Sequence, residues 1–111
     1  MMSFEIDRAD GIGVVRPKGR LTMASAPQFS RTVSDLVESG CSRIVVDLSQ
    51  TSFIDSSGLG ALVASLKTTR KAGGDLRLAA TTEQIDTVLQ LTNLNRVLQP
   101  SPTVAAARAL F

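Results

Sequence analysis

The chain begins with an alternation of hydrophobic and polar residues that is typical of a β-hairpin. Residues 3–9, SFEIDRA, place Phe4 and Ile6 between polar neighbours, and a second apolar run, IGVVRP, begins at residue 12. The dipeptide Asp10-Gly11 between the two runs marks a tight turn. The pattern therefore predicts two antiparallel strands at the start of the chain.

From residue 24 the hydrophobic spacing changes to that of an amphipathic helix. The apolar positions fall at i, i+4, i+7 and i+8, namely Phe29, Val33, Leu36 and Val37. Gly40 is a suitable C-terminal stop. The run RIVVDL that follows is continuously apolar, as in a strand buried on both faces of a parallel sheet.

A second helix is predicted after the stretch SQTSFIDSSG. Its apolar stripe has the spacing i, i+3, i+4 and i+7 and consists of Leu59, Leu62, Val63 and Leu66. We expect this stripe to pack against Phe29, Ile44 and Val45. Lys67, Arg70 and Lys71 fall in the last turns, where cations suit the helix dipole, and Gly73-Gly74 ends the element.

The last third of the chain continues the alternation of strands and helices. DLRLAA reads as a short strand, and TTEQIDTVLQLT as a helix capped by Thr81 or Thr82. RVLQP is compatible with a last short strand. SPTVAAARALF indicates a final helix with Ser101 as N-cap and Pro102 at its first position.

These elements give the order ββαβαβα(β)α. Strand–helix–strand units of this length form parallel crossovers, whereas the opening hairpin adds an antiparallel pair. The prediction is an α/β fold with a mixed sheet of four to five strands and about four helices. Neither a linker nor a repeat interrupts the 111 residues, so we expect one domain over residues 1–111.

The amino-acid composition argues against several classes of function. The chain lacks histidine and has one cysteine, Cys41, so no intramolecular disulfide, zinc cluster or redox pair can form. The net charge is +2, and the basic residues are scattered without interleaved aromatic side chains, which favours a solvated surface over nucleic-acid binding. With no signal-peptide core and no membrane-length apolar run, we expect a cytoplasmic protein that does not insert into membranes.

The candidate chemistry lies in Asp55-Ser56-Ser57-Gly58, between a strand and the second helix. Functional groups of α/β folds gather at the carboxyl ends of strands, and a helix N-terminus favours an anion. This stretch could therefore accept a phosphate. The structural alternative is that Ser56 or Ser57 caps the helix, with Asp55 helping.

Helix capping does not explain the two glycines of this segment. Gly58 and Gly60 lie early in the helix, where each costs about 0.5–1 kcal/mol relative to alanine. Together with Ala61, Ala64 and Ser65 they predict a helix face almost bare of side chains, which another protein could approach closely. Tight internal packing is the alternative explanation.

The same segment lacks the motifs of the common catalytic and nucleotide sites. It has neither the lysine of a P-loop nor the complete G-x-G-x-x-G pattern of a dinucleotide fold. Ser57 lacks the G-x-S-x-G elbow and a histidine base. We therefore expect no catalysis, no cofactor and no metal.

Residues 45–63, VVDLSQTSFIDSSGLGALV, resemble the central motif of the STAS domain, as found in bacterial anti-sigma factor antagonists. The resemblance covers nearly the whole chain and includes GRLTMASAPQF, AGGDLRLAA and LQLTNLNRVL. It implies a STAS fold and a partner that is a GHKL-type serine kinase acting as an anti-sigma factor. That partner binds the unmodified antagonist, releases its sigma factor and can phosphorylate a serine. A cognate phosphatase and a monomer or weak dimer are also implied.

The phosphoacceptor of the family matches Ser57. The resemblance and the bare helix face together place the partner on Asp55, Ser56, Ser57, Gly58, Gly60, Ala61, Ala64, Arg20 and Thr22. The chain departs from the family in two segments. Arg20-Leu21-Thr22 occupies the positions at which the family usually has an acidic residue, leucine and aspartate. Asn93-Leu94-Asn95 occupies a segment in which the family commonly has a glycine. We expect Arg20 to steady a phosphate and Asp55 to position the serine hydroxyl.

Two other functions remain open from the sequence. The chain could be a STAS subunit of another assembly, such as a lipid-transport complex or a stress-signalling particle, that docks through the same motif. It could also be a sensor of a nucleotide or another small molecule. A neighbouring kinase gene would favour the function of an anti-sigma factor antagonist, whereas neighbouring transporter genes would favour a subunit of another assembly. Nucleotide binding by the isolated protein would favour a sensor.

Overall fold

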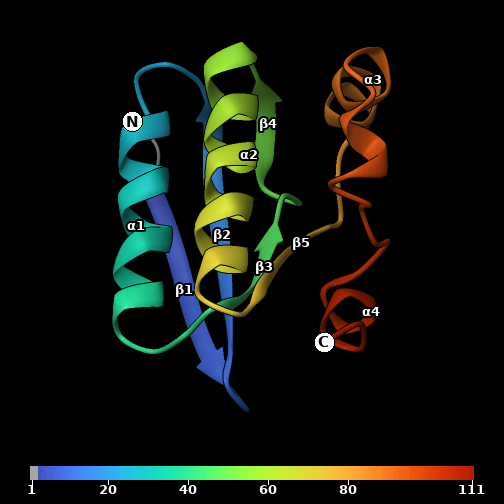
Figure 1. Cartoon of the computed structure of the whole chain (residues 1–111). Helices are drawn as coiled ribbons and strands as arrows, with labels where there is room; N and C mark the ends of the chain where they lie inside the picture. The colour runs from blue at the N-terminus through green and yellow to red at the C-terminus, as the bar shows by residue number, and fades with distance from the viewer. Residues whose placement is uncertain (1–2) are drawn as a thin grey trace.

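The computed structural model describes residues 3–111 and confirms the α/β fold (Figure 1). Met1 and Met2, which belong to the predicted domain, lie outside the described residues. The elements are β1 (Ser3–Ala9), β2 (Ile12–Leu21), α1 (Ala26–Glu38), β3 (Arg43–Asp47), β4 (Thr51–Ile54), α2 (Ser56–Lys71), β5 (Asp75–Ala79), α3 (Glu83–Leu91), the 3-10 helix η1 (Leu94–Arg96) and α4 (Val104–Arg108).

The predicted hairpin is confirmed. β1 and β2 pair antiparallel from Ser3 opposite Lys18 to Ala9 opposite Ile12. At the turn, Asp10 has φ 56° and Gly11 φ 76°. Two positive φ angles in a row fit the two-residue turn whose twist matches that of the strands, and aspartate and glycine tolerate them best.

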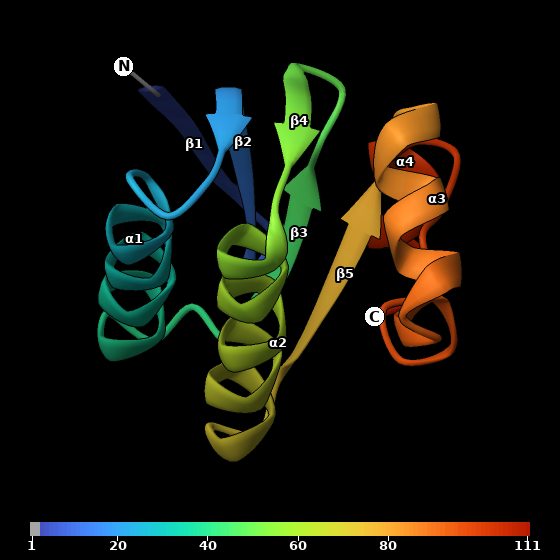
Figure 2. The same cartoon turned by 90° about the horizontal axis from the view of Figure 1, so that it is seen from above.

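The long strand β2 carries two parallel neighbours one after the other. Its first half, Ile12–Val15, pairs with β3, and its last residues, Gly19–Leu21, pair with β4 beyond a register shift at Gly19/Arg20. β5 pairs with the other edge of β3, which gives a mixed five-stranded sheet. In Figure 2, α1 and α2 lie side by side over one face, and α3 and α4 lie at the β5 end.

The strand β4 corrects the predicted element order. The sequence reading placed the stretch between Asp47 and Asp55 in a loop, because its buried residues Thr51 and Ile54 are three positions apart and show no alternation. The fifth strand comes from here and not from RVLQP. That segment begins at Arg96, the last residue of η1, and after it a single bridge joins Ser101 to Ala79.

The core has two parts, one on each face of the sheet. The larger cluster joins β2, β3, β4 and β5 to α1, α2 and α3, and it buries Leu59, Leu62 and Leu66 as predicted, with Val63 partly buried against it. The smaller cluster lies beneath α4. Val45 belongs to this smaller cluster, so the prediction that it packs against the α2 stripe is wrong. It faces the other side because neighbours along a strand alternate between faces.

The structure identifies the N-caps of the last two α-helices. Thr82 is the N-cap of α3, one of the two residues predicted. α4 begins later than predicted: its N-cap is Thr103, whose side chain accepts a hydrogen bond from the Ala106 amide, and not Ser101. Ser101 is instead held at the sheet edge, where its amide donates to the Leu78 carbonyl.

Candidate functional site

The candidate site forms where β2 and β4 end next to each other. Leu21 pairs with Ile54 at the carboxyl ends of these parallel strands, so the two following loops leave the sheet at the same edge. The first loop leads through Thr22 and Met23 into α1, and the second consists of Asp55 at the start of α2. The parallel pairing therefore brings residues 22–23 and 55–58 together.

Asp55 is the N-cap of α2. Its backbone is extended, with φ −106° and ψ −175°, and its Oδ1 accepts a hydrogen bond of 2.8 Å from the Gly58 amide. The expectation that Ser56 or Ser57 caps the helix is thus corrected, since both lie inside the first turn. Ser56 is exposed and Ser57 is partly exposed. Because Asp55 caps the helix, neither serine side chain is needed as the N-cap.

The same carboxylate also holds the neighbouring loop. Its Oδ2 accepts a hydrogen bond of 3.2 Å from the Met23 amide, and the Asp55 amide donates to the Leu21 carbonyl at 3.3 Å. The hydrogen bond from the Gly58 amide, supported by that from Met23, lowers the pKa of Asp55. Asp55 therefore stays ionised near neutral pH and ties the β2–α1 loop to the start of α2.

Gln84 of α3 holds the strand end that precedes Asp55. Its Oε1 accepts a hydrogen bond from the Ile54 amide and its Nε2 donates to the Ile54 carbonyl, each at 3.1 Å. The carboxamide thus pairs with the free edge of β4 as a further strand would. Sequence reasoning missed this residue, because no local pattern connects two positions thirty residues apart.

The small residues of α2 divide into two sets. A Cβ on Gly58 would lie 2.2 Å from the Leu21 carbonyl oxygen, so this glycine is required by packing against the end of β2. Ala61 is also buried, with 7% of its surface exposed. A Cβ on Gly60 would meet nothing within 4 Å, and Ala64 is exposed as well.

The predicted bare face is therefore corrected. Gly58, Ala61 and Ser65 lie on the buried side of α2, where the alternative explanation of tight packing holds. What remains accessible is a narrower strip, which we call the open side of α2: Ser56, Gly60 and Ala64, with Ser57 at its margin. A partner can touch these residues without unpacking the helix.

Arg20, near the end of β2, and Thr22, in the loop that follows, lie beside the site. The Arg20 guanidinium lies over the ring of Phe53, 4.7 Å from its centroid, which is cation–π geometry. The Ser25 hydroxyl donates to the Arg20 carbonyl at 2.8 Å and accepts from the Thr22 amide at 3.0 Å, which fixes the turn. That Arg20 steadies a phosphate stays a prediction.

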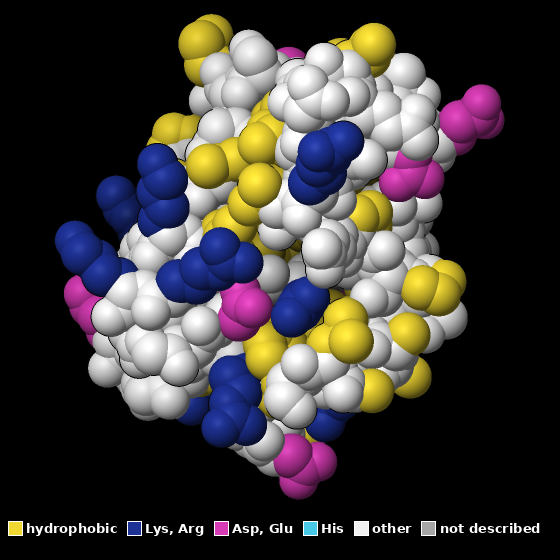
Figure 3. All heavy atoms as spheres, turned by 45° about the vertical axis from the view of Figure 1, so that its right-hand side comes forward, with side chains coloured by type: hydrophobic (Ala, Val, Ile, Leu, Met, Phe, Trp, Pro, Cys, Tyr) yellow, Lys and Arg dark blue, Asp and Glu magenta, His cyan; other side chains and the backbone are white. Residues whose placement is uncertain are grey.

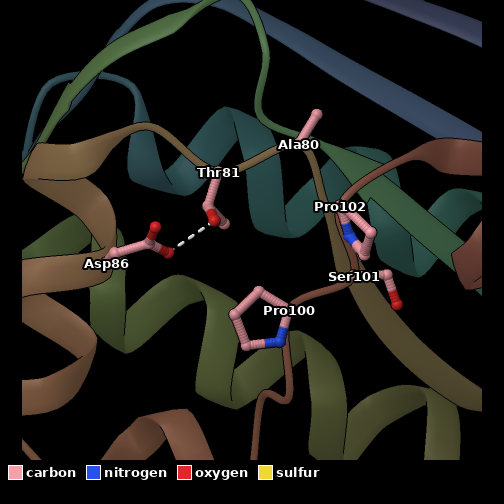
Figure 4. A pocket seen from close by; sticks show the side chains of 6 residues that line it. All are labelled: Ala80, Thr81, Asp86, Pro100, Ser101 and Pro102. Carbon is pink, nitrogen blue, oxygen red and sulfur yellow. Dashed lines mark hydrogen bonds between the residues drawn. The ribbon is translucent and has the colours of Figure 1, made fainter.

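Two pockets of the described structure lie outside the candidate site. One lies after the end of β5, lined by Ala80, Thr81, Asp86, Pro100, Ser101 and Pro102, with the Thr81 hydroxyl 2.5 Å from Asp86 Oδ1 (Figure 4). The other lies on α3 and includes Gln84. Neither contains a predicted site residue.

Residues 3–111 hold no group of three or more Cys, Asp or Glu side chains placed to bind a metal ion. None of their helices combines the length and the apolar character that a membrane crossing requires.

The site and the fold match one protein family. The model of the STAS domain matches residues 3–107, which include every strand and helix of the structure except Arg108, the last residue of α4. The chain belongs to the STAS domain family. The resemblance carried by DSSGLG is thereby confirmed, and so is the assignment of the fold.

Several of the similar proteins are named anti-sigma factor antagonists. A Thermotoga maritima protein assigned to this class is 32% identical over 105 residues, which are 94% of this chain and 93% of that protein. The anti-sigma-B factor antagonist of Bacillus subtilis is 30% identical over 83 residues, 75% of each chain. The crystal structure of a Thermotoga maritima protein of this class superposes with a TM-score of 0.89 at 31% identity, covering 96% of this chain and 92% of the other.

Proposed function

We propose that this STAS protein is an anti-sigma factor antagonist that acts in the cytoplasm and is switched by phosphorylation of Ser57. The observation that carries the proposal is the placement of Ser57. It lies in the first turn of α2, partly exposed, in a segment held by Asp55 and Gln84, and beside the open Gly60. The names of the similar proteins supply the class of partner, an anti-sigma factor.

The partner is proposed to bind the β4–α2 junction and the open side of α2. An exposed glycine lets the backbone of another protein approach the helix more closely than any side chain would. The unmodified antagonist would hold the anti-sigma factor and so free the sigma factor. The chain itself performs no catalytic step; a GHKL-type kinase domain of the anti-sigma factor supplies the phosphoryl group, and a phosphatase removes it.

Phosphorylation would act at the surface and leave the fold intact. A phosphoserine adds about −1.5 to −2 charges at neutral pH and three acceptor oxygens. At a helix N-terminus this charge meets a favourable dipole, while the Asp55 carboxylate already holds the Gly58 amide. The phosphate is therefore directed outward, where its bulk and charge meet the partner.

The proposal is tested by retrieving partners from the native cell with wild type, Ser57→Asp and Ser57→Ala side by side. We expect wild type and Ser57→Ala to retain an anti-sigma factor, and Ser57→Asp to lose it. Only Ser57→Ala should resist the kinase when both it and wild type are incubated with that partner and ATP. The melting temperature of Ser57→Asp should stay close to that of wild type, because the substituted side chain lies at the surface.

Two results would contradict the proposal. A well-folded Ser57→Asp that binds the anti-sigma factor as tightly as wild type would remove the switch. Retrieval of transport components with no anti-sigma factor would instead favour the subunit of another assembly.

A further inference from the structure

The exposed strip of α2 does not stop at Ala64. Lys67, Arg70 and Lys71 are exposed at the C-terminal part of the helix, and we call these three residues the cationic end. Arg70 donates from Nε to Asp75 Oδ1 at 3.1 Å. Within residues 3–111, neither Lys67 nor Lys71 has a carboxylate within ion-pair distance. Two ammonium groups thus stay uncompensated.

Helix geometry places the two lysines of the cationic end on the same side as the proposed binding strip. Each residue turns the helix by about 100°, so Ser56, Gly60, Ala64, Lys67 and Lys71 fall within a sector of about 80°. With a rise of about 1.5 Å per residue, Ser57 lies roughly 15 Å from Lys67 and 21 Å from Lys71 along the axis. A partner surface of about 800 Å², which is roughly 28 Å across, covers both ends.

The helix dipole explains only part of the cationic end. Positive side chains are favoured in the last turn, which accounts for Arg70 and Lys71, but the effect falls off within that turn. Lys67 lies a full turn earlier than Lys71. Its charge therefore has no evident role in holding the helix.

We propose that the cationic end is the second half of the partner interface and binds an acidic patch on the anti-sigma factor. This inference rests on the proposed function. Ser57 and Gly60 would form a neutral contact that phosphorylation closes, while Lys67 and Lys71 steer the encounter and set its orientation, as charges at an interface rim do.

A protein surface fits the cationic end better than a nucleic acid or a membrane. Figure 3 shows one face of the molecule, on which Lys and Arg side chains lie among hydrophobic and neutral atoms. The net charge of the chain is only +2. A polyanion would be met by a longer basic run, whereas a short cluster beside an open glycine suits one discrete acidic patch.

The test compares two variants with the same net charge. Lys67→Glu/Lys71→Glu and the control Arg8→Glu/Arg31→Glu each change the charge by −4, from +2 to −2. Arg8 lies on β1 and Arg31 on α1, and both are exposed. Each purified protein, with wild type and Ser57→Asp, is titrated against every serine-kinase anti-sigma factor of the source organism at low and moderate salt. Vesicles of phosphatidylglycerol form a parallel arm.

We expect Lys67→Glu/Lys71→Glu to bind the anti-sigma factor about tenfold more weakly than wild type, chiefly through slower association, and with less dependence on salt. The control should stay within about threefold of wild type. If wild type and both double variants bind alike while Ser57→Asp does not bind, the cationic end has no role and the proposed function stands.

The remaining outcomes also decide the matter. If no anti-sigma factor binds wild type, the proposed function and this inference fail together. If the two lysines are required for vesicle binding but not for the anti-sigma factor, the cationic end contacts membranes and the inference is wrong. Equal weakening of both double variants would show a general charge effect and would also overturn it.

Discussion

The two sides of α2 use the same kinds of residue for opposite reasons. On the packed side, Gly58 is small because a Cβ there would lie 2.2 Å from the Leu21 carbonyl oxygen of β2, and Ala61 is buried. On the open side, Gly60 and Ala64 are exposed, and a Cβ added to Gly60 would meet nothing within 4 Å. A glycine in a helix costs stability, so Gly60 is the one that folding does not explain.

The packed side of α2 contributes to the stability of the domain, whereas the open side is exposed at its surface. Leu62 and its buried neighbours fasten α2 to the sheet, and Asp55 fixes the start of the helix. The open side can then accept a phosphate, a partner or a substitution at little cost to the fold. The comparison therefore predicts large stability effects on one side and large binding effects on the other.

The largest stability effect is expected from Leu62→Ala on the packed side. Leu62 is fully buried, so its truncation leaves a cavity and should lower the free energy of unfolding by about 2–5 kcal/mol. Urea unfolding followed by circular dichroism measures this. A loss near zero would show that the buried stripe does not carry the core.

Gly58→Ala and Gly60→Ala compare the two sides with a single methyl group. The Gly58 methyl group would lie 2.2 Å from a backbone oxygen, which should cost about 3 kcal/mol or more. The Gly60 methyl group enters open space, and the gain in helix propensity should raise the free energy of unfolding by about 0.5–1 kcal/mol. Melting curves of both variants measure the two effects. Similar destabilisation by Gly58→Ala and Gly60→Ala would contradict the distinction between a packed and an open side of α2.

The dependence of stability on pH tests the role of a buried carboxylate, Asp47, which lies outside the candidate site. Asp47 lies on the sheet face opposite α2; burial raises its pKa, but hydrogen bonds from Ser49 and Arg16 outweigh this and hold the pKa below its ordinary value. Because the folded pKa lies below the unfolded value of about 3.9, the stabilisation is present above that value and is lost as the pH falls through the folded pKa.

Asp47→Asn should therefore flatten the loss of stability below about pH 4. It should also cost about 1.5 kcal/mol at pH 7, since Arg16 loses a charged partner. Denaturant unfolding at several pH values between 3 and 7 measures both effects. Asp55 has a lowered pKa as well, so some acid dependence should remain in the variant. An unchanged pH profile would contradict the role of Asp47.

The smallest effect on folding is expected from the two lysines of the cationic end. Lys67 and Lys71 are exposed and lie outside every ion pair found within residues 3–111, so their charge reversal should change the melting temperature by only a few degrees. A large drop would mean that the cationic end serves the fold.

The sequence predicted much of the fold because its strongest patterns are local. The turn at Asp10-Gly11, the stripe from Leu59 to Leu66 and the apolar run of β3 each depend on neighbouring residues. β4 escaped detection because it has four residues and no alternation. The bridge at Ser101 depends on contact with Ala79, which no local spacing reveals.

The candidate site shows the same limit. DSSG marked the start of α2 and led to the family, but which residue caps the helix depends on the backbone angles at Asp55. The sequence did not distinguish Gly58 from Gly60 either, because the difference is the distance to the Leu21 carbonyl. The contacts of Met23 and Gln84 with this segment join distant parts of the chain, and so they needed the structure.

The central claim is that the open side of α2 is kept bare for a partner, and Gly60→Gln tests it most directly. Glutamine is a better helix former than glycine and its side chain enters open space, so the melting temperature should rise or stay unchanged. The affinity for the anti-sigma factor, measured by calorimetric titration, should fall at least about tenfold because the added side chain prevents close approach. A variant that is as stable as wild type and binds the anti-sigma factor equally well would contradict the claim.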